Sequence, residues 1–357
     1  MQDWLNCRVL VTGHTGFKGT WLTEWLLLAG AKVSGLSLAP DRSNVNFELL
    51  EHEARLEKHY VCDLLDKNYL NFCIAESQPD VVFHLAAQAL VRRGYREPLL
   101  TWETNVLGTL NVLEAVRIAN NPTTVIVVTT DKVYQDRGHG LPFKENDPLG
   151  GYDPYSASKA SCELAVVSWR NSFAPNMSIR VATARAGNVI GAGDFNEDRI
   201  VPDCYKMWKQ GIPVSLRNPN ATRPWQHVLE PLSGYLDLAQ YVRSGANQVF
   251  TAYNFGPGRS GECSVADLVA LLAQYDGDRV WETAFGDKLY ETQNLTLCND
   301  LAKQILGWEP ILALEEAALW TDRGYSVPHS LLPSLIRDQI QQYRNLRSKH
   351  RIEEFNR

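Results

Sequence analysis

The chain has 357 residues, of which 45% are hydrophobic and 21% charged, with a formal net charge of −6 at pH 7. This composition indicates a globular protein with a substantial core, and the length allows one large α/β domain with an added lobe. The negative charge and the scatter of lysines and arginines argue against nucleic acid as a partner, because phosphate binding needs a concentrated basic face.

Seven cysteines occur without a C-x-x-C pair, which indicates reduced thiols and predicts a cytoplasmic location. The first strand-like segment begins at residue 8, which leaves no room for a signal peptide. The apolar run at residues 25–29 is too short to cross a bilayer. We therefore expect no membrane association.

The first half of the chain alternates between short apolar runs and amphipathic segments. We expect strands at residues 8–12, 32–38, 80–85, 124–130 and 178–184, and helices at residues 19–28, 50–58, 104–119 and 156–169. Alternation at this spacing produces right-handed βαβ units. The sequence therefore predicts an α/β fold of the Rossmann type, with a doubly wound parallel sheet.

Three glycines follow the first predicted strand with the spacing G-x-x-G-x-x-G and open the first predicted helix. Glycine permits positive φ and lets backbone N–H groups approach a pyrophosphate, which the helix N-terminus attracts. A tight structural turn is the alternative, but the strand–helix context favours a dinucleotide site. We expect cofactor contacts from Gly13, His14, Thr15, Gly16, Phe17 and Gly19.

The acidic residue that usually follows the second strand and binds the adenine ribose is absent, since residues 36–38 are Leu-Ser-Leu. Asp41, slightly beyond, would favour NAD, whereas Arg42 would favour a 2′-phosphate. Asp63 and Leu64 follow the next strand, where a carboxylate could bond the adenine amino group. An exposed loop aspartate is the alternative there.

Tyr155 and Lys159 are four residues apart in a predicted helix and therefore share one face. A tyrosine is a poor base at neutral pH, because its ordinary pKa is near 10. A neighbouring ammonium and a positive nicotinamide both favour the phenolate, so we expect the pKa of Tyr155 to be lowered.

The glycine turn and the Y-x-x-x-K pair resemble the short-chain dehydrogenase/reductase superfamily, and the length points to its extended branch, which modifies nucleotide sugars. The resemblance covers about residues 7–325. It implies NAD as cofactor, a nucleotide-sugar substrate, and a homodimer formed through the helices at residues 104–119 and 156–170. Residues that match other motifs of the branch are expected near the cofactor, namely Leu85, Ala86, Ala87 and Asn105, and near the substrate, namely Gln88 and Asn188.

Asp131 and Lys132 follow the strand-like run at residues 124–130, where simple epimerases of this branch carry small residues. Sugar 4,6-dehydratases carry Asp-Glu here, or Asp-Lys in the subset that acts on CDP-glucose, and the sequence is similar to the second form. A solvated turn pair is the alternative.

The resemblance implies a role for each residue of this group. Tyr155 would take the C4 hydroxyl proton, Thr130 would bond the C4 oxygen, and Asp131 would protonate the departing C6 hydroxyl. Lys132 would remove the C5 proton, orient Asp131 or stabilise the enolate, and the sequence leaves these alternatives open. The alternatives for the whole protein are a dehydratase of another nucleotide sugar, a 4-epimerase, or a non-catalytic relative that binds a dinucleotide.

After residue 188 the alternation ends, and glycines and prolines separate short segments, which indicates a smaller C-terminal substrate-binding lobe. We expect the substrate diphosphate to be held by Asn188, Arg199, Arg217, Arg223 and His227, with Arg223 foremost and with surface ion pairs as the alternative for Arg199 and Arg217. No group of His, Cys and Asp has metal-ligand spacing, so we predict no metal. The predicted division is an NAD-binding domain at residues 1–187 with returning segments at about 223–255, a lobe at 188–222 and 256–325, and a helical extension at 326–357.

Overall fold

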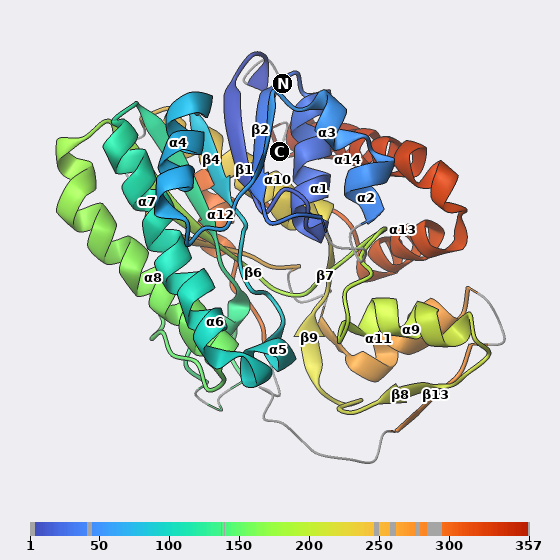
Figure 1. Cartoon of the computed structure of the whole chain (residues 1–357). Coiled ribbons are helices and arrows are strands. Elements are labelled where there is room, and N and C mark those ends of the chain that lie inside the picture. Colours follow the sequence, from blue (N-terminus) through green and yellow to red (C-terminus); the bar gives the residue numbers. More distant parts are fainter. Residues whose placement is uncertain are drawn as a thin grey trace.

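The computed structural model describes residues 4–40, 45–136, 138, 140–245, 250–257, 262–275, 279–283 and 295–355. Its centre is a seven-stranded sheet with the strand order β11-β6-β5-β4-β1-β2-β3 (Figure 1). All of its strand pairs are parallel. The strands are β1 (Arg8–Thr12), β2 (Lys32–Ser37), β3 (Lys58–Val61), β4 (Val81–His84), β5 (Thr123–Val128), β6 (Ile179–Ala186) and β11 (Ala252–Phe255). The predicted doubly wound parallel sheet is thereby confirmed.

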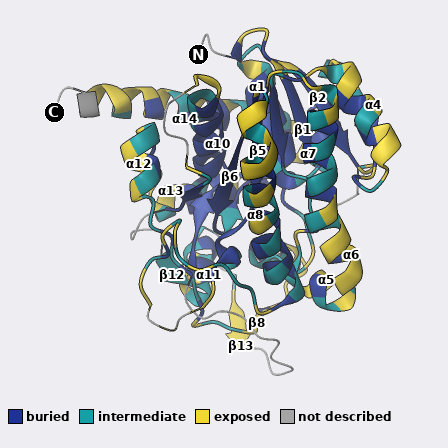
Figure 2. Ribbon diagram, turned by 90° about the vertical axis from the view of Figure 1, so that its left-hand side faces the viewer, coloured by how far each residue is buried: buried dark blue, intermediate teal, exposed yellow. Residues whose placement is uncertain are grey.

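Both faces of the sheet are apolar because each is covered by helices. In β1, Val9 and Val11 face one core and Leu10 faces the other. The first core is closed by α1 (Phe17–Leu28), α10 (Leu229–Arg243), α12 (Asp300–Leu306) and α14 (Leu332–Phe355). The second is closed by α4 (Lys67–Ser77), α7 (Gly108–Ala119) and α8 (Pro154–Phe173). The sheet is accordingly buried, whereas the outer faces of α4, α7 and α8 are partly exposed (Figure 2).

The helix predicted at residues 50–58 is wrong in its second half. The segment forms a short helix, α3 (His52–Arg55), which follows α2 (Val45–Leu49), and Lys58 already begins β3. Residues 58–61 pair with β2, so a tertiary contact overrides the local pattern. The helix predicted at residues 104–119 begins with a π-helical turn, Glu103–Leu107, which follows α5 (Val91–Arg96) and α6 (Pro98–Trp102).

The smaller lobe has a separate core. Its helices are α9 (Ile200–Trp208), α11 (Val265–Ala273) and α13 (Leu314–Ser326). Its strands form three short pairs, namely β8 (Val214–Leu216) with β13 (Trp281–Thr283), β7 (Val189–Ile190) with β10 (Gln226–His227), and β9 (Thr222–Pro224) with β12 (Glu262–Ser264). The segments α10 and β11 return to the main sheet. Ala302 and Trp308 also pack in the main core, so part of the predicted lobe belongs with the sheet.

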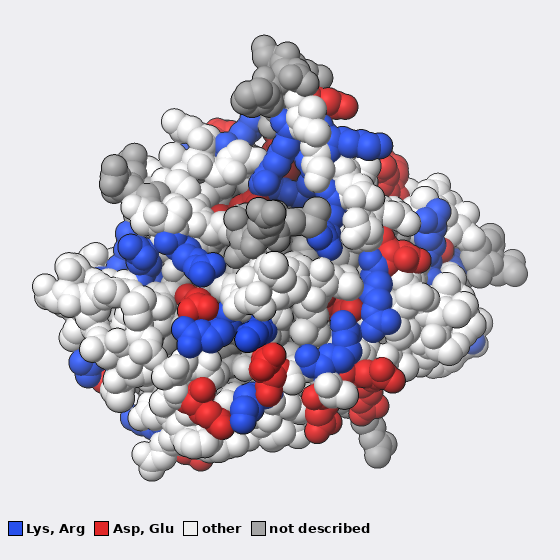
Figure 3. Space-filling view, turned by 90° about the horizontal axis from the view of Figure 1, so that it is seen from above, with Lys and Arg blue, Asp and Glu red and all other residues white. Residues whose placement is uncertain are grey.

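The C-terminal helix α14 is part of the main domain. Its Tyr343 ring packs edge-on against Trp25 of α1, with centroids 5.7 Å apart, and the Arg337 Nε donates to Glu24 Oε1 at 2.9 Å. Of the described helices, none has the length and apolarity that spanning a membrane demands. Seen from above, basic and acidic side chains are interspersed over the surface (Figure 3).

Candidate active site

The glycine turn between β1 and α1 is built so that only glycine fits at two of its positions. Gly13 has φ of +73°, and a Cβ there would lie 2.7 Å from the backbone nitrogen of Ala86. A Cβ on Gly19 would lie 2.1 Å from the carbonyl oxygen of Gly13. Gly16 caps α1 without a side-chain hydrogen bond, and the first turn of α1 carries no acidic residue. This helix N-terminus therefore fits an anionic pyrophosphate.

The side chains of the turn point mainly into the protein. The His14 ring is buried against Gly35 of β2 and packs on the His59 ring, with centroids 4.9 Å apart. Burial lowers the pKa of His14 to about 3, so the ring is neutral, and its contact with a cofactor is confined to the backbone. The Thr15 hydroxyl lies 3.0 Å from the Ser37 hydroxyl, and Phe17 is buried next to Gly191.

The loop after β4, residues 85–88, lies beside the glycine turn at the point where the sheet order reverses. The backbone N–H of Ala86 donates to Thr12 Oγ1 at 3.2 Å. The Asn105 amide accepts from the Gln88 N–H at 2.8 Å and donates to the Ser158 hydroxyl at 2.9 Å. Asn105 thus connects this loop, which includes Leu85 and Ala87, to helix α8.

Gln88 is held by contacts within the protein. Its side-chain amide donates to Thr101 Oγ1 at 2.8 Å, and its side-chain carbonyl oxygen accepts from the Leu90 N–H at 2.7 Å. The side chain is buried and both ends of its amide contact the protein. Gln88 therefore shapes the loop, and its expected contact with the substrate stays a prediction.

At the adenine end, Asp63 is exposed and its carboxylate accepts from the Leu65 N–H at 2.9 Å. Leu64 is buried beneath α7, where the Asn111 amide donates to its carbonyl oxygen at 2.9 Å. The structure thus places Asp63 in an exposed turn. Residues 41 and 42, on which the choice between NAD and NADP was based, lie outside the described residues.

Helix α8 carries the expected Tyr155–Lys159 pair, and both side chains are buried. Asp153 caps the helix by accepting from the Ser156 N–H at 3.0 Å, and Pro154 occupies its first turn. The Lys159 ammonium donates to the Val128 carbonyl oxygen at 3.0 Å, which ties the helix to the end of β5.

Burial governs the pKa of Tyr155 in the chain alone, and the lowering expected from Lys159 together with a bound nicotinamide stays a prediction. Burial raises the pKa of Tyr155 to about 12, although the charge of Arg199 and a hydrogen bond with Thr130 act to lower it. Burial also lowers the pKa of Lys159. Desolvation of the phenolate therefore outweighs the favourable charges of the chain.

The Thr130-Asp131-Lys132 segment follows β5 and forms a single 3-10 turn, Asp131–Val133. The Thr130 hydroxyl lies between Tyr155 and Asp131, and it donates to Asp131 Oδ1 at 2.9 Å. Asp131 is buried, which excludes the solvated turn pair for this residue, and its Oδ2 has no hydrogen-bond partner among the described residues.

Burial raises the pKa of Asp131 against the opposing influence of the Lys132 charge and of the Thr130 hydrogen bond. A carboxyl group in this state retains its proton more readily than an exposed one. Asp131 is therefore suited to act as a general acid.

Two of the arginines expected to hold the diphosphate lie at this centre. Arg223 is buried and close enough to Asp131 for its charge to lower the pKa of that carboxyl. The charge of Arg199 acts on Tyr155. Asn188 is half-buried at the junction of β6 and β7, with its carbonyl oxygen accepting from the Gln226 N–H at 3.1 Å.

The other two residues expected to contact the substrate have protein neighbours in this structure. Arg217 forms an exposed ion pair with Asp198, at 3.6 Å between Nη1 and Oδ1, which is the alternative considered for this residue. His227 is fully buried, with its ring edge-on to Trp21 and Trp320 at 5.6 Å from each. Burial lowers the pKa of His227 to about 3, so it is a neutral core residue.

The structure adds two residues that the sequence analysis missed. The Lys18 ammonium donates to the Tyr235 hydroxyl at 3.3 Å, and its charge interacts with that of Asp131. Burial, helped by the charge of Arg199, lowers the pKa of Lys18 to about 7. Lys18 lies inside the glycine motif and could have been noticed there. Tyr235 is 217 residues further on, and no local pattern marks it.

The reversal of strand order between β1 and β4 thus brings the glycine turn next to the loop that Asn105 ties to the Tyr155 helix. This arrangement, with a second lobe behind it, defines an extended short-chain dehydrogenase/reductase. A family model described as GDP-mannose 4,6 dehydratase matches residues 10–319, and the chain belongs to this family.

Individual relatives agree with this assignment. The chain is 40% identical over 320 residues to a CDP-glucose 4,6-dehydratase of Salmonella typhimurium, covering 88% of this chain and 89% of the relative. It is 27% identical over 317 residues to a UDP-glucose 4-epimerase of Mycolicibacterium smegmatis, covering 87% and 95%. The fold is similar to that of a dTDP-glucose 4,6-dehydratase from Streptomyces venezuelae with NAD bound, with a TM-score of 0.78, 23% identity and coverage of 92% and 99%.

Proposed function

We propose that the chain is an NAD-dependent nucleotide-sugar 4,6-dehydratase, that its substrate is CDP-glucose and that its product is the 4-keto-6-deoxy sugar. The observation that carries the proposal is the state of Asp131, a buried carboxyl with a raised pKa that is linked to Tyr155 through Thr130 and whose Oδ2 has no hydrogen-bond partner within the described part of the chain. A plain dehydrogenase or epimerase needs no such acid, because its reaction ends with hydride transfer at one carbon. The 40% identity to a CDP-glucose 4,6-dehydratase supports the choice of nucleotide.

The first half of the proposed reaction oxidises C4. Tyr155 takes the proton of the C4 hydroxyl, and Thr130 bonds the same oxygen. When bound, the nicotinamide supplies the acceptor for the C4 hydride and later the donor of a hydride to C6. Its positive charge and the Lys159 ammonium both act to lower the pKa of Tyr155, which burial holds at about 12 in the chain alone.

The second half eliminates water across C5 and C6. The C4 ketone acidifies the C5 proton, a base removes that proton, and Asp131 gives its own proton to the C6 oxygen as the C6–O bond breaks and water leaves. When a hydride returns to C6, the protonated base gives the proton back to C5, which completes the 4-keto-6-deoxy sugar. Lys132 is close enough to Asp131 to influence its pKa, and it is the C5 base, a group that orients Asp131, or the cation that stabilises the enolate. The pH dependence separates the first role from the last, because a base must first lose its proton whereas a stabilising cation must keep it.

The substrate diphosphate is proposed to bind Arg223 and Arg199, the two arginines whose charges act on the catalytic groups. Guanidinium groups suit this task because they donate several hydrogen bonds in a fixed plane. Asn188, at the β6–β7 junction between sheet and lobe, is proposed as a further donor.

The test is incubation of the purified protein with CDP-glucose and NAD, followed by NMR of the product. We expect a 4-keto-6-deoxy sugar without net formation of NADH. In Asp131→Asn, we expect product formation to fall by about 10²–10⁴-fold, the usual contribution of a general acid. A C4-epimerised product would reject dehydration, and activity confined to sugars of other nucleotides would reject CDP-glucose.

We also propose a homodimer through the outer faces of α7 and α8, together with α6. Large apolar side chains are exposed along these helices and the turn before α7, namely Leu99, Leu107, Ile118, Leu164 and Phe173. Light scattering on the purified protein tests this.

A cytoplasmic location is proposed because all seven cysteines are free of disulfide bonds.

A further inference from the structure

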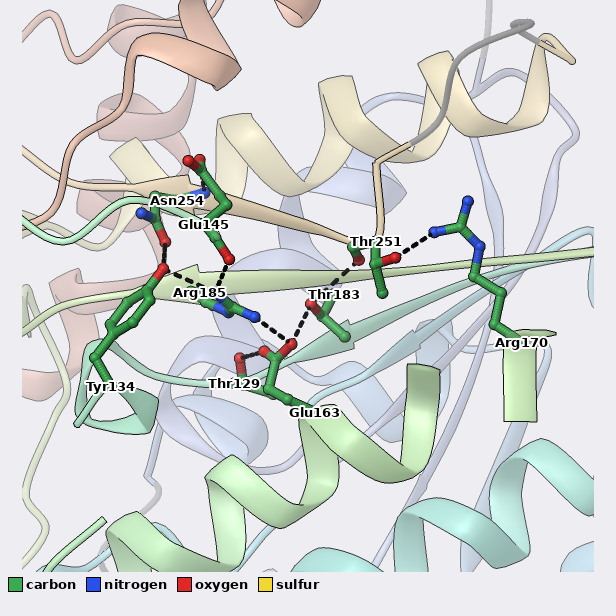
Figure 4. A network of polar contacts seen from close by, with 9 residues as sticks. All are labelled: Thr129, Tyr134, Glu145, Glu163, Arg170, Thr183, Arg185, Thr251 and Asn254. Carbon is green, nitrogen blue, oxygen red and sulfur yellow. Dashed lines mark hydrogen bonds and ion pairs between the residues drawn. The ribbon is translucent and has the colours of Figure 1, made fainter. Parts of the chain in front are cut away.

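A buried ion pair contacts Thr129 and Tyr134, the two residues that flank residues 130–133 of the catalytic segment (Figure 4). Its members are Glu163, on helix α8, and Arg185, on strand β6, with 2.9 Å between Oε2 and Nη2. Their side chains are 0% and 4% exposed. Neither residue has a role in the proposed chemistry, so the position of this pair needs its own explanation.

Glu163 binds the end of strand β5 to the catalytic helix. Its carboxylate accepts hydrogen bonds from Thr129 and, at 2.8 Å, from Thr183. Glu163 lies one helical turn after Lys159, and Thr129 immediately precedes Thr130. The carboxylate thus fixes the N-terminal side of the catalytic segment to the helix that carries Tyr155.

Arg185 holds the other side of the same segment. Its Nη1 donates to the Tyr134 hydroxyl at 2.8 Å and to the Glu145 carbonyl oxygen at 3.0 Å, and its guanidinium lies 5.0 Å above the Tyr134 ring. The Tyr134 hydroxyl in turn donates to Asn254 of β11 at 2.6 Å. Burial opposes the charge of Arg185, but the charges and hydrogen bonds of Glu163 and Tyr134 together outweigh burial and raise the pKa of the guanidinium. Arg185 is therefore fixed and charged.

The two halves of the active site depend on different contacts. Tyr155 and Lys159 are held by helix α8 itself, by Ser158, whose hydroxyl donates to the Tyr155 carbonyl oxygen at 2.7 Å, and by the bond from Lys159 to Val128. Asp131 and Lys132 instead lie between Thr129 and Tyr134, the two residues that the ion pair holds. Loss of the pair should therefore move the acid and leave the tyrosine in place.

We propose that Glu163 and Arg185 are positioning residues for the elimination half of the reaction, which hold Asp131 relative to Tyr155 without contacting the substrate. This inference rests on the proposed function for its kinetic consequence. The geometric claim, that the pair orders residues 130–133, is independent of which sugar is bound.

The variant that tests this must not leave a single buried charge, because an unpaired charge destabilises the whole fold. We therefore replace both members, as Glu163→Leu with Arg185→Met. The control is Asp237→Leu with Arg347→Met, an ion pair between α10 and α14 whose side chains are 14% and 10% exposed, with 2.5 Å between Nη2 and Oδ2. Asp237 also pairs with Arg351, whose exposed side chain stays solvated in this variant. Neither member of the control pair belongs to the proposed catalytic machinery.

The first measurement is hydrogen exchange of the wild-type protein and both double variants. In the Glu163/Arg185 variant, we expect exchange of the peptide covering residues 129–136 to accelerate by about tenfold or more, as for a segment that opens locally. The peptide covering residues 153–161, which contains Tyr155 and Lys159 but not the substituted position, should be unchanged, and the control variant should change neither peptide. Unchanged exchange of residues 129–136 would overturn the inference, whatever the substrate proves to be.

The second measurement separates the two half-reactions in single turnovers with the nucleotide sugar that the wild type converts. We expect the rate of C4 oxidation to stay within about threefold of wild type and the rate of elimination to fall by about tenfold or more, since small displacements of a reacting group slow a reaction by this amount. Reduced nicotinamide would then accumulate. An equal fall in both half-reactions would show a merely structural role and reject the proposal, as would an unchanged turnover. Failure of the wild type to convert CDP-glucose would instead reject the proposed substrate.

Discussion

Glu230, in the first turn of α10, offers a quantitative test of how burial controls ionisation in this fold. One carboxylate oxygen accepts from the N–H groups of Ile311 and Leu312 at 3.0 and 2.7 Å, and the other accepts from the Tyr343 hydroxyl at 2.6 Å. The residue is 1% exposed, and burial raises its pKa from an ordinary value of 4.5 to about 7 despite these hydrogen bonds.

The raised pKa makes the contribution of Glu230 to stability depend on pH. The folded state holds the proton more tightly than the unfolded state, so the contribution is complete below pH 4.5 and is lost as the pH rises toward about 7. This difference between the pKa values of the folded and unfolded states corresponds to about 3 kcal/mol of folding free energy, since a tenfold change in proton affinity is worth about 1.4 kcal/mol.

We therefore predict that Glu230→Gln gains stability relative to wild type as the pH rises. Glutamine does not titrate, and its amide can accept from the two N–H groups and donate to the Tyr343 oxygen. Urea unfolding at pH 5 and pH 8 should show the difference between variant and wild type growing by about 2–3 kcal/mol. Glu353→Gln, an exposed position on α14, is the control. A difference that is the same at both pH values would refute the reasoning.

Three further predictions concern the site. Tyr155→Phe should lower turnover by about 10²–10⁴-fold while NAD binding, followed by fluorescence, persists; turnover near wild type would contradict its role as base. Gly13→Ala should cost about 1–3 kcal/mol and weaken NAD binding, because φ is +73° and the new Cβ meets Ala86; an unchanged Tm and affinity would count against this. Arg217→Ala should leave KM within about fivefold of wild type, because its exposed ion pair with Asp198 contributes little, and a much larger rise in KM would restore it as a substrate contact.

The sequence by itself determined the features that depend on neighbours along the chain. The alternation of apolar runs and amphipathic segments predicted the parallel sheet, because both faces of its strands are covered. The glycine spacing predicted the turn after β1, where Gly13 and Gly19 have no room for a Cβ. The four-residue spacing placed Tyr155 and Lys159 on one face of α8.

Only the tertiary structure decided how polar side chains are buried and with what partners. His227 was expected to hold the diphosphate, yet two tryptophans from distant elements pack edge-on against its ring. In the chain alone burial raises the pKa of Tyr155, because desolvation depends on everything packed around the hydroxyl. Glu163 and Arg185 meet across a helix and a strand. Such pairings join residues far apart in the chain, so their energies arise only when the packed core removes water from both partners.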